Sequence, residues 1–227
     1  MTEPAKRKVA AFDFDGTLSK RDTLMPFLLR VTGPSRFAQI LAQIGFSGMR
    51  RSIHLRDRDE VKAEMIHRAM CGRRKEDLQR LGRLYARDLL VNELNPVVLE
   101  RLQQHRDACH ELLFVSASLT YYLEPLAEAL GVNAVIAVEP TVESGLLTGN
   151  MNFPNVRAEQ KAIRLRAWLS ETAIDPMSSV ELWSYGNSSG DNELLKMADH
   201  AYWLGKSSKL PAGAQVMISS STPFSLD

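Results

Sequence analysis

Short apolar runs alternate with amphipathic stretches over much of this chain. The runs predict buried strands at 9–12, 112–116, 134–138, 180–185 and 201–204. Helical spacing of apolar residues predicts helices at 96–107, 122–130, 158–170 and 191–197. Strands that alternate with helices imply right-handed crossovers and a mostly parallel sheet covered on both faces. The expected fold class is therefore α/β, with a doubly wound parallel sheet.

Residues 22–94 interrupt this alternation. Apolar positions at helical spacing over 36–44, 59–70 and 75–91 predict an all-helical insertion, with loops at Gly33-Pro34, 45–48 and 71–72. We therefore divide the chain into a core of residues 1–20 and 95–227 and an inserted helical cap of residues 21–94. The cap interior is expected to hold Phe37, Ile40, Leu41, Ile44, Phe46, Met49, Met65 and Met70.

Two further segments complete the prediction for the core. Residues 142–153 predict a hairpin, with Ser144-Gly145 and Thr148-Gly149-Asn150 as turn residues. The tail after Pro211 is expected to be a loose terminus.

Polar residues follow three of the predicted strands directly. They are Asp13 and Asp15, then Ser116 to Ser118, then the segment from Gly186 to Asp191. In a doubly wound sheet, ligands bind outside the carboxyl ends of the strands. We therefore expect these side chains to converge on one site.

Asp13 and Asp15 are the most informative pair. Side chains two positions apart on a strand point the same way, so the two carboxylates would emerge together and repel each other. A hard cation such as Mg²⁺ would offset that charge. The alternative interpretation is a strand that ends in an Asx turn at Asp15-Gly16.

Composition limits the classes of function. The chain has 227 residues, 44% of them hydrophobic and 24% charged, and a formal net charge of +1 that gives no reason to expect nucleic-acid binding. Residues 50–88 carry twelve Lys or Arg and seven Asp or Glu, which indicates either a solvated helical face or attraction to an anionic substrate or membrane surface.

The cysteines, the histidines and the N-terminal residues say little about the function. Two cysteines without metal-type spacing, and no apolar window long enough to span a membrane, favour a cytoplasmic protein. The apolar run after Lys6-Arg7-Lys8 is too short for a signal peptide. The five histidines show no ligand spacing and are interpreted as incidental.

The order of motifs resembles the haloacid dehalogenase superfamily. The motifs are Asp13-x-Asp15-Gly16-Thr17, the Phe-Val-Ser-Ala-Ser segment around Ser116, Ala-Glu-Gln-Lys-Ala around Lys161, and Tyr-Gly-Asn-Ser-Ser-Gly-Asp ending at Asp191. The chain is similar to the phosphoserine-phosphatase-like branch, subfamily IB, whose helical cap lies between the first and second motifs. That branch includes phosphatidylglycerophosphatase C-like relatives. The resemblance implies a Rossmann-like core.

The resemblance also implies roles for the first motif. Asp13 would be the nucleophile that forms an aspartyl-phosphate, and Asp15 would be the general acid and then the base. The backbone carbonyl of Asp15 would ligate Mg²⁺, and Gly16 would let its N–H approach the transferred phosphoryl group. Thr17 would brace the loop.

The second and third motifs would bind the phosphoryl group. Ser116 would donate its hydroxyl and Ala117 its N–H, and Lys161 would neutralise the charge. Without that context, Ser116 is interpreted as a turn residue and Lys161 as a solvated surface lysine. The neighbouring Arg157, Arg164 and Arg166 are interpreted as surface charge.

The fourth motif departs from the acidic family pattern. Asn187 stands where the simplest form has an Asp, and Asp191 stands at the second acidic position. The amide oxygen of Asn187 still suits a hard cation, but one negative charge fewer should weaken the attraction of Mg²⁺. Gly190 stands where phosphoserine phosphatases tend to carry Asn.

Asp22 carries an open alternative. It falls where phosphoserine phosphatases have a Glu that reads the substrate, but Asp-Thr before an apolar run is also typical of a helix N-cap.

We therefore expect an Mg²⁺-dependent phosphomonoester hydrolase for a small phosphorylated metabolite. A second Asp in the first motif favours phosphoryl transfer over dehalogenation, because an alkoxide leaving group must be protonated. The alternatives are a lipid-phosphate phosphatase of the phosphatidylglycerophosphate type in peripheral contact with a membrane, or a catalytically weak phosphate-binding protein. A receiver domain lacks the Asp-x-Asp-Gly-Thr motif and an insertion of this size.

Overall fold

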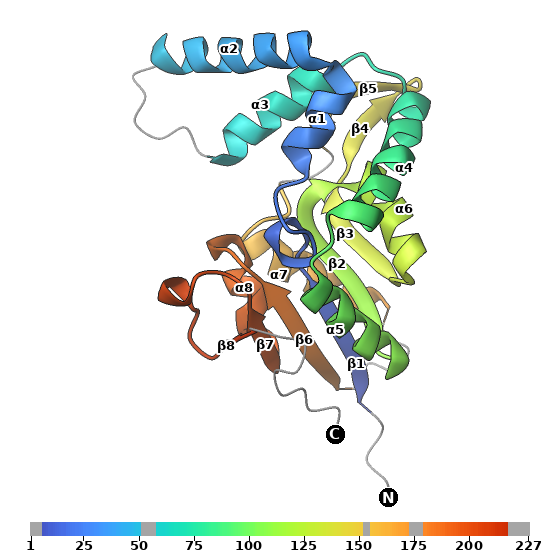
Figure 1. The fold of residues 1–227 in the computed structure, drawn as a ribbon, viewed down its shortest axis with the longest axis vertical. Coiled ribbons are helices and arrows are strands. Elements are labelled where there is room, and N and C mark those ends of the chain that lie inside the picture. Colours follow the sequence, from blue (N-terminus) through green and yellow to red (C-terminus); the bar gives the residue numbers. More distant parts are fainter. Residues whose placement is uncertain (1–5, 51–57, 152–154, 173–178, 218–227) are drawn as a thin grey trace, which may run out of the picture.

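The computed structural model describes residues 6–50, 58–151, 155–172 and 179–217, and its centre is a six-stranded, wholly parallel sheet (Figure 1). The strand order β3-β2-β1-β6-β7-β8 places the first strand in the middle. Residues 9–12 are completely buried because helices cover both faces of the sheet. The predicted α/β fold is confirmed. The strands are β1 (Arg7–Phe12), β2 (Glu111–Leu119), β3 (Ala134–Val138), β6 (Val180–Gly186), β7 (His200–Trp203) and β8 (Gln215–Val216).

The helices of the core lie close to their predicted positions. They are α5 (Pro96–Asp107), α6 (Thr120–Leu130), α7 (Glu159–Glu171) and α8 (Asn192–Lys196). Local chemistry explains two of the boundaries. The side chain of Asn95 accepts the N–H of Val97 and caps α5, and Gly131 ends α6 in the left-handed conformation at φ 71°.

The helical insertion follows β1 and precedes α5, and its four helices lie at the end of the molecule opposite the two termini (Figure 1). Ile40, Met65 and Met70 are buried among them as predicted, whereas Leu41 is 47% exposed and was wrongly assigned to the interior. The side chains of Phe46 and Met49 lie outside the described residues. The division at residues 20/21 and 94/95 stays a prediction. The helices are α1 (Leu24–Thr32), α2 (Pro34–Arg50), α3 (Arg58–Met70) and α4 (Lys75–Asn92).

A hairpin from the later sequence is bonded to this helical insertion. Strands β4 (Pro140–Glu143) and β5 (Leu146–Met151) are antiparallel, as predicted. The turn is at Ser144-Gly145, whereas the turn predicted at 148–150 was wrong because these residues lie within β5. Leu147 exchanges backbone hydrogen bonds with the turn between α3 and α4, since Gly72 N donates to Leu147 O (2.8 Å) and Leu147 N donates to Arg73 O (2.8 Å). The hairpin and the insertion are therefore joined through their backbones.

Two other expectations were wrong. The predicted loop at 45–48 is part of α2, because glycine in a helix costs only about 1 kcal/mol and does not prevent the helix from continuing. The expected loose tail forms β8, and the N–H of Met217 donates to Trp203 O (2.9 Å). Residues 218–227 lie outside the described residues.

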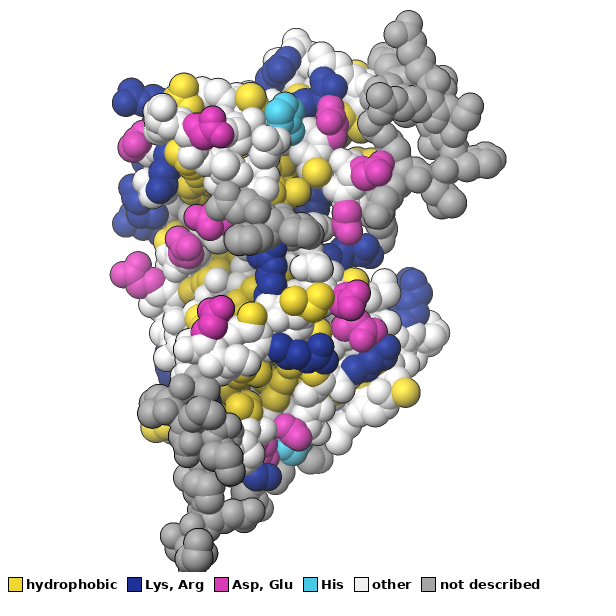
Figure 2. Space-filling view, turned by 180° about the vertical axis from the view of Figure 1, so that it is seen from behind, with side chains coloured by type: hydrophobic (Ala, Val, Ile, Leu, Met, Phe, Trp, Pro, Cys, Tyr) yellow, Lys and Arg dark blue, Asp and Glu magenta, His cyan; other side chains and the backbone are white. Residues whose placement is uncertain are grey.

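On the face drawn in Figure 2, basic and acidic side chains are intermixed over both halves of the molecule. In the part of the chain that the structure describes, no helix is long and apolar enough to cross a membrane.

Candidate active site

Asp13 follows β1 directly at the carboxyl edge of the sheet. Its N–H donates to Tyr185 O of β6 (2.9 Å), which extends the ladder by one residue and fixes where the side chain emerges. Asp13 as a whole residue is 5% exposed, and its Oδ2 accepts a hydrogen bond from Thr17 Oγ1 (2.9 Å). Gly16 turns the chain at φ 78°, a conformation that favours glycine. The hydrogen bond to β6 and the hydrogen bond from Thr17 therefore fix the position of Asp13.

Lys161, from the first turns of α7, lies between two carboxylates. Its Nζ is 2.5 Å from Asp13 Oδ1 and 2.6 Å from Asp191 Oδ1, and the lysine is 2% exposed. Burial and the nearby Asp191 raise the pKa of Asp13 to about 7. Burial alone would lower the pKa of Lys161, but Asp13 and Asp191 raise it above its ordinary value. The lysine is therefore a fixed cation.

Asp191 is held by the turn that follows β6. Its Oδ2 accepts hydrogen bonds from the N–H of Asn187 (3.1 Å), the N–H of Ser188 (2.9 Å) and the hydroxyl of Ser188 (3.0 Å). Burial would raise the pKa of Asp191, but Lys161 and Ser188 outweigh it and lower the pKa. Asn187 reaches the first loop, because a Cβ added to Gly16 would lie 2.1 Å from Asn187 Nδ2.

Asp15 is half-buried, and both of its carboxylate oxygens accept hydrogen bonds. Oδ1 accepts from Thr23 N (2.8 Å) and Thr23 Oγ1 (2.5 Å), and Oδ2 accepts from Ser118 Oγ. Burial raises the pKa of Asp15 although these hydrogen bonds oppose the shift. The sequence did not reveal these partners, since neither Thr23 nor Ser118 was singled out for them.

Ser116 and Ala117 lie near the end of β2, where the pairing with β3 shifts register between Val115 and Leu119. Such an irregularity re-aims side chains at a sheet edge. Ser116 is fully buried, and its Oγ accepts the N–H of Ser118 (3.1 Å). Asp22 Oδ2 accepts the N–H of Met25 (3.0 Å), as the N-cap interpretation predicts, and Asp22 also faces the cavity described next.

A cavity of about 280 Å³ connects Asp13, Asp15, Lys161 and Asp191, whereas Ser116 and Asn187 do not line it. Sequence reasoning missed four residues of its wall, Asp59 and Lys62 of α3 and Asn155 and Arg157 before α7. Arg157, which was interpreted as surface charge, has a side chain that is 31% exposed and that also lines this cavity. The spacing of Asp59 and Lys62 places both on one helix face, but nothing in the sequence says that this face meets the core.

These four residues join the insertion to the core. Asn155 Nδ2 donates to Asp59 Oδ1 (2.7 Å), and Lys62 Nζ donates to the carbonyl of Ala117 and to Asn155 Oδ1 (3.4 Å). Burial lowers the pKa of Lys62. The insertion therefore places a cation on the wall of the cavity that holds Asp13.

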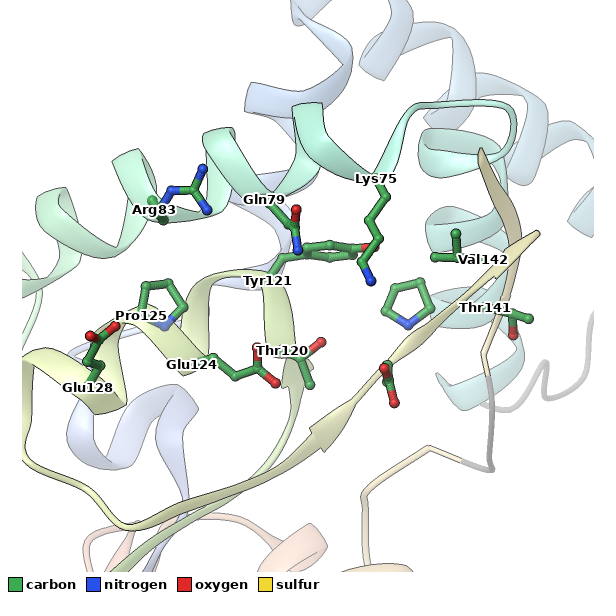
Figure 3. A pocket seen from close by; sticks show the side chains of 12 residues that line it. Lys75, Gln79, Arg83, Thr120, Tyr121, Glu124, Pro125, Glu128, Thr141 and Val142 are labelled. Carbon is green, nitrogen blue, oxygen red and sulfur yellow. The ribbon is translucent and has the colours of Figure 1, made fainter. Parts of the chain in front are cut away.

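A larger cavity of about 480 Å³ lies between α4, α6 and β4 and contains none of the predicted site residues (Figure 3). Lys75 and Arg83 on α4 and Glu124 on α6 contribute to its walls, and Tyr121 lies among them. Size alone would point to the wrong place, because the buried charges are in the smaller cavity.

The predicted metal set fits Mg²⁺ by charge and donor type. In the described part of the chain, no three His, Cys, Asp or Glu side chains gather closely enough to hold a metal by themselves. Asp13 and Asp191 nevertheless share a single ammonium, so their site keeps excess negative charge. Asn187 adds an amide oxygen, and hard oxygen donors are those that Mg²⁺ prefers. The Asp15 carboxylate faces Thr23 and Ser118, which leaves its backbone carbonyl as the predicted donor.

The fold and this constellation define the class of protein. The sequence model of the haloacid dehalogenase-like hydrolase family matches residues 10–196 of this chain, and the chain belongs to that family. The matched range contains every predicted site residue from Asp13 to Asp191.

Individual proteins are also similar to this chain in sequence or in fold. Protein CicA of Caulobacter vibrioides is 28% identical over 197 residues, which cover 84% of this chain and 83% of CicA. A protein of unknown function from Bordetella pertussis Tohama I has a similar structure (TM-score 0.72, 21% identity, 88% of this chain and 90% of that chain). A substrate-bound phosphoserine phosphatase shares the fold (TM-score 0.57, 15% identity, 88% and 86% coverage).

Proposed function

We propose that this protein is an Mg²⁺-dependent phosphomonoesterase that acts on a small phosphorylated metabolite through an aspartyl-phosphate. The observation that carries the proposal is the buried group of Asp13, Lys161 and Asp191 at the carboxyl edge of the sheet. A nucleophilic carboxylate beside a fixed cation is the arrangement that attack on a phosphoryl group requires. A cytoplasmic location stays a prediction.

In the first step, a carboxylate oxygen of Asp13 forms a bond to phosphorus while the bond from phosphorus to the leaving oxygen breaks. Asp15 donates its proton to that oxygen. The Ser116 hydroxyl and the Ala117 N–H would bind phosphoryl oxygens, and Lys161 keeps Asp13 oriented. In the second step, Asp15 takes a proton from water, which attacks phosphorus and releases phosphate from Asp13.

Mg²⁺, when bound, would neutralise charge on the phosphoryl oxygens. Asp13, the backbone carbonyl of Asp15, Asn187 and Asp191 would hold it. Because Asn187 is neutral, we expect weaker metal attraction than at a site with three carboxylates.

The test is Mg²⁺-dependent release of phosphate from an aryl phosphate by the wild type and by Asp13→Asn. We expect the variant to lose turnover by at least about 10⁴-fold, because no carboxylate remains to attack. Asp107→Asn, at the exposed end of α5, is the matched control. Wild-type turnover in Asp13→Asn would refute the aspartyl-phosphate mechanism, and an inactive wild type would favour the phosphate-binding alternative.

A substrate screen then separates the remaining alternatives. It compares phosphoserine, sugar phosphates, nucleotides and detergent-dispersed lipid phosphates. A preference for the lipid phosphates would mean that the substrate is a lipid phosphate and not a small metabolite.

A further inference from the structure

Thr23 occupies the point where the chain passes from the site into the insertion. It is 1% exposed and immediately precedes α1. Two of its groups, the backbone N–H and the hydroxyl, donate to Asp15 Oδ1. Ser118 donates to the other oxygen from the core side. The Asp15 carboxylate is therefore held between Ser118 of the core and Thr23, which lies near the start of the insertion.

Thr23 is itself held by two tyrosines from different parts of the molecule. Tyr85 of α4, in the insertion, donates its hydroxyl to the carbonyl of Thr23 (2.9 Å). Tyr122 of α6, in the core, has its hydroxyl 3.1 Å from Thr23 Oγ1. Both rings pack on Phe27 of α1, with centroids 5.4 Å and 4.9 Å away. A displacement of α4 relative to α6 would thus move Thr23.

We infer that Thr23 and Ser118 are positioning residues for Asp15, and that Tyr85 makes the position of Thr23 depend on the seating of the insertion. This inference rests on the proposed role of Asp15 as general acid. Proton transfer needs the acid within hydrogen-bond reach of the leaving oxygen, so a carboxylate that rotates freely transfers its proton poorly. With the insertion seated as in this structure, three donors restrict that rotation.

A simpler role for Thr23 would be to start α1. The two roles can be distinguished by substrates whose leaving groups differ in their need for a proton. A poor leaving group such as an alkoxide needs its proton from Asp15, whereas dinitrophenolate departs without one. Loss of the Thr23 hydroxyl should therefore slow alkyl phosphates selectively. A general disturbance of the fold would slow both kinds of substrate alike.

The experiment measures kcat/KM for an alkyl phosphate and for dinitrophenyl phosphate. In Thr23→Val the backbone N–H remains, and we expect about a tenfold loss on the alkyl substrate and less than about twofold on the aryl substrate, a fraction of the 10²–10⁴-fold range of acid catalysis. Ser118→Ala should behave in the same way, and Thr23→Ser should restore wild-type values. Tyr85→Phe should show the same selectivity with a loss of about threefold.

Tyr121→Phe is the matched control for Tyr85→Phe, since Tyr121 lines the other cavity (Figure 3). Equal losses on both substrates, or none in Thr23→Val and Ser118→Ala, would overturn the inference while the proposed function stands. An inactive wild type would overturn both, and a wild-type rate in Asp13→Asn would overturn the mechanism that gives Asp15 its role.

Discussion

In the core, the charges around Lys161 are almost entirely buried, whereas the insertion's ion pairs lie at its surface. Lys161, Asp13 and Asp191 have side chains 2%, 8% and 1% exposed. The pair Arg30–Asp88, between α1 and α4, is 39% and 55% exposed, and Arg80–Asp77 on α4 is 64% and 55% exposed. Exposed pairs contribute about 0–1 kcal/mol, because water and salt screen them.

The difference indicates that the core and the insertion contribute to the site in different ways. A buried cation between two carboxylates is costly to assemble and is more useful for chemistry than for stability. The insertion instead meets the site through separate hydrogen bonds. Lys62 donates to Ala117 and Asn155, Asp59 accepts from Asn155, and Thr23 donates to Asp15. If this comparison is right, substitutions in the core should be severe and those in the insertion graded.

The largest effect is expected from Lys161→Met. The variant leaves Asp13 and Asp191 buried together without their shared cation, and breaking a buried ion pair costs about 3–5 kcal/mol. Denaturant unfolding should show this loss, together with abolished turnover. Lys75→Met, at an exposed lysine of α4, is the control. A loss below about 1 kcal/mol in Lys161→Met would contradict the view that the core charges depend on one another.

The second prediction concerns His105 of α5, which is fully buried and bonded to His110 Nδ1 and to the hydroxyl of Tyr185 (both 2.8 Å). Burial lowers the pKa of His105 to about 2. Below about pH 6.5 the unfolded chain binds a proton that the folded chain excludes. The free energy of unfolding should therefore fall as the pH falls, by up to about 1.4 kcal/mol per pH unit.

The raised pKa of Asp13 acts in the opposite direction between about pH 7 and 4, so the slope of the wild type alone is not diagnostic. Urea unfolding of the wild type and of His105→Gln should be compared between pH 6.5 and 4.5. The variant should lose the His105 part of the slope, and His67→Gln, at an exposed histidine, should keep it. Equal slopes in the wild type and His105→Gln would show that His105 does not contribute to the pH dependence of stability.

The third prediction tests the seam between the insertion and the core. A Cβ at Gly82 of α4 would lie 2.0 Å from Tyr121 O of α6, so Gly82→Ala must push the two helices apart. We expect destabilisation of about 1–3 kcal/mol despite the better helix propensity of alanine. Gly45→Ala in α2 has open space around it and should stabilise by about 0.5–1 kcal/mol. Thermal unfolding that ranks the two variants in the reverse order would break the comparison.

The smallest effect is expected from Lys62→Met. This change removes the insertion's cation from the cavity wall but keeps the apolar stem, and we expect KM to rise about five- to tenfold, equivalent to about 1–1.4 kcal/mol, with kcat little changed. Lys75→Met again serves as the control. Unchanged KM would show that Lys62 acts only on Ala117 and Asn155.

Much of the site was predictable because strand ends are visible in the sequence. The apolar run before Asp13 and the one before Gly186 placed two motifs at the same edge of the sheet, and the structure confirms that Asp13, Lys161 and Asp191 meet there. Asp15 also lines the cavity, but its hydrogen bonds to Thr23 and Ser118 were not foreseen. Those bonds join residues 8 and 103 positions apart, and no local pattern encodes them.

The amino-acid sequence by itself determined the α/β class, the helical character of the insertion and which side-chain types follow the strands, because periodicity and residue type are local properties. Only the tertiary structure decided which face of α3 meets the core, that the hairpin bonds to the α3–α4 turn, and that Arg157 lines the cavity. The physical reason is that such contacts depend on how finished elements pack. An amphipathic helix specifies that one face is buried, but the partner of that face is set by the whole fold.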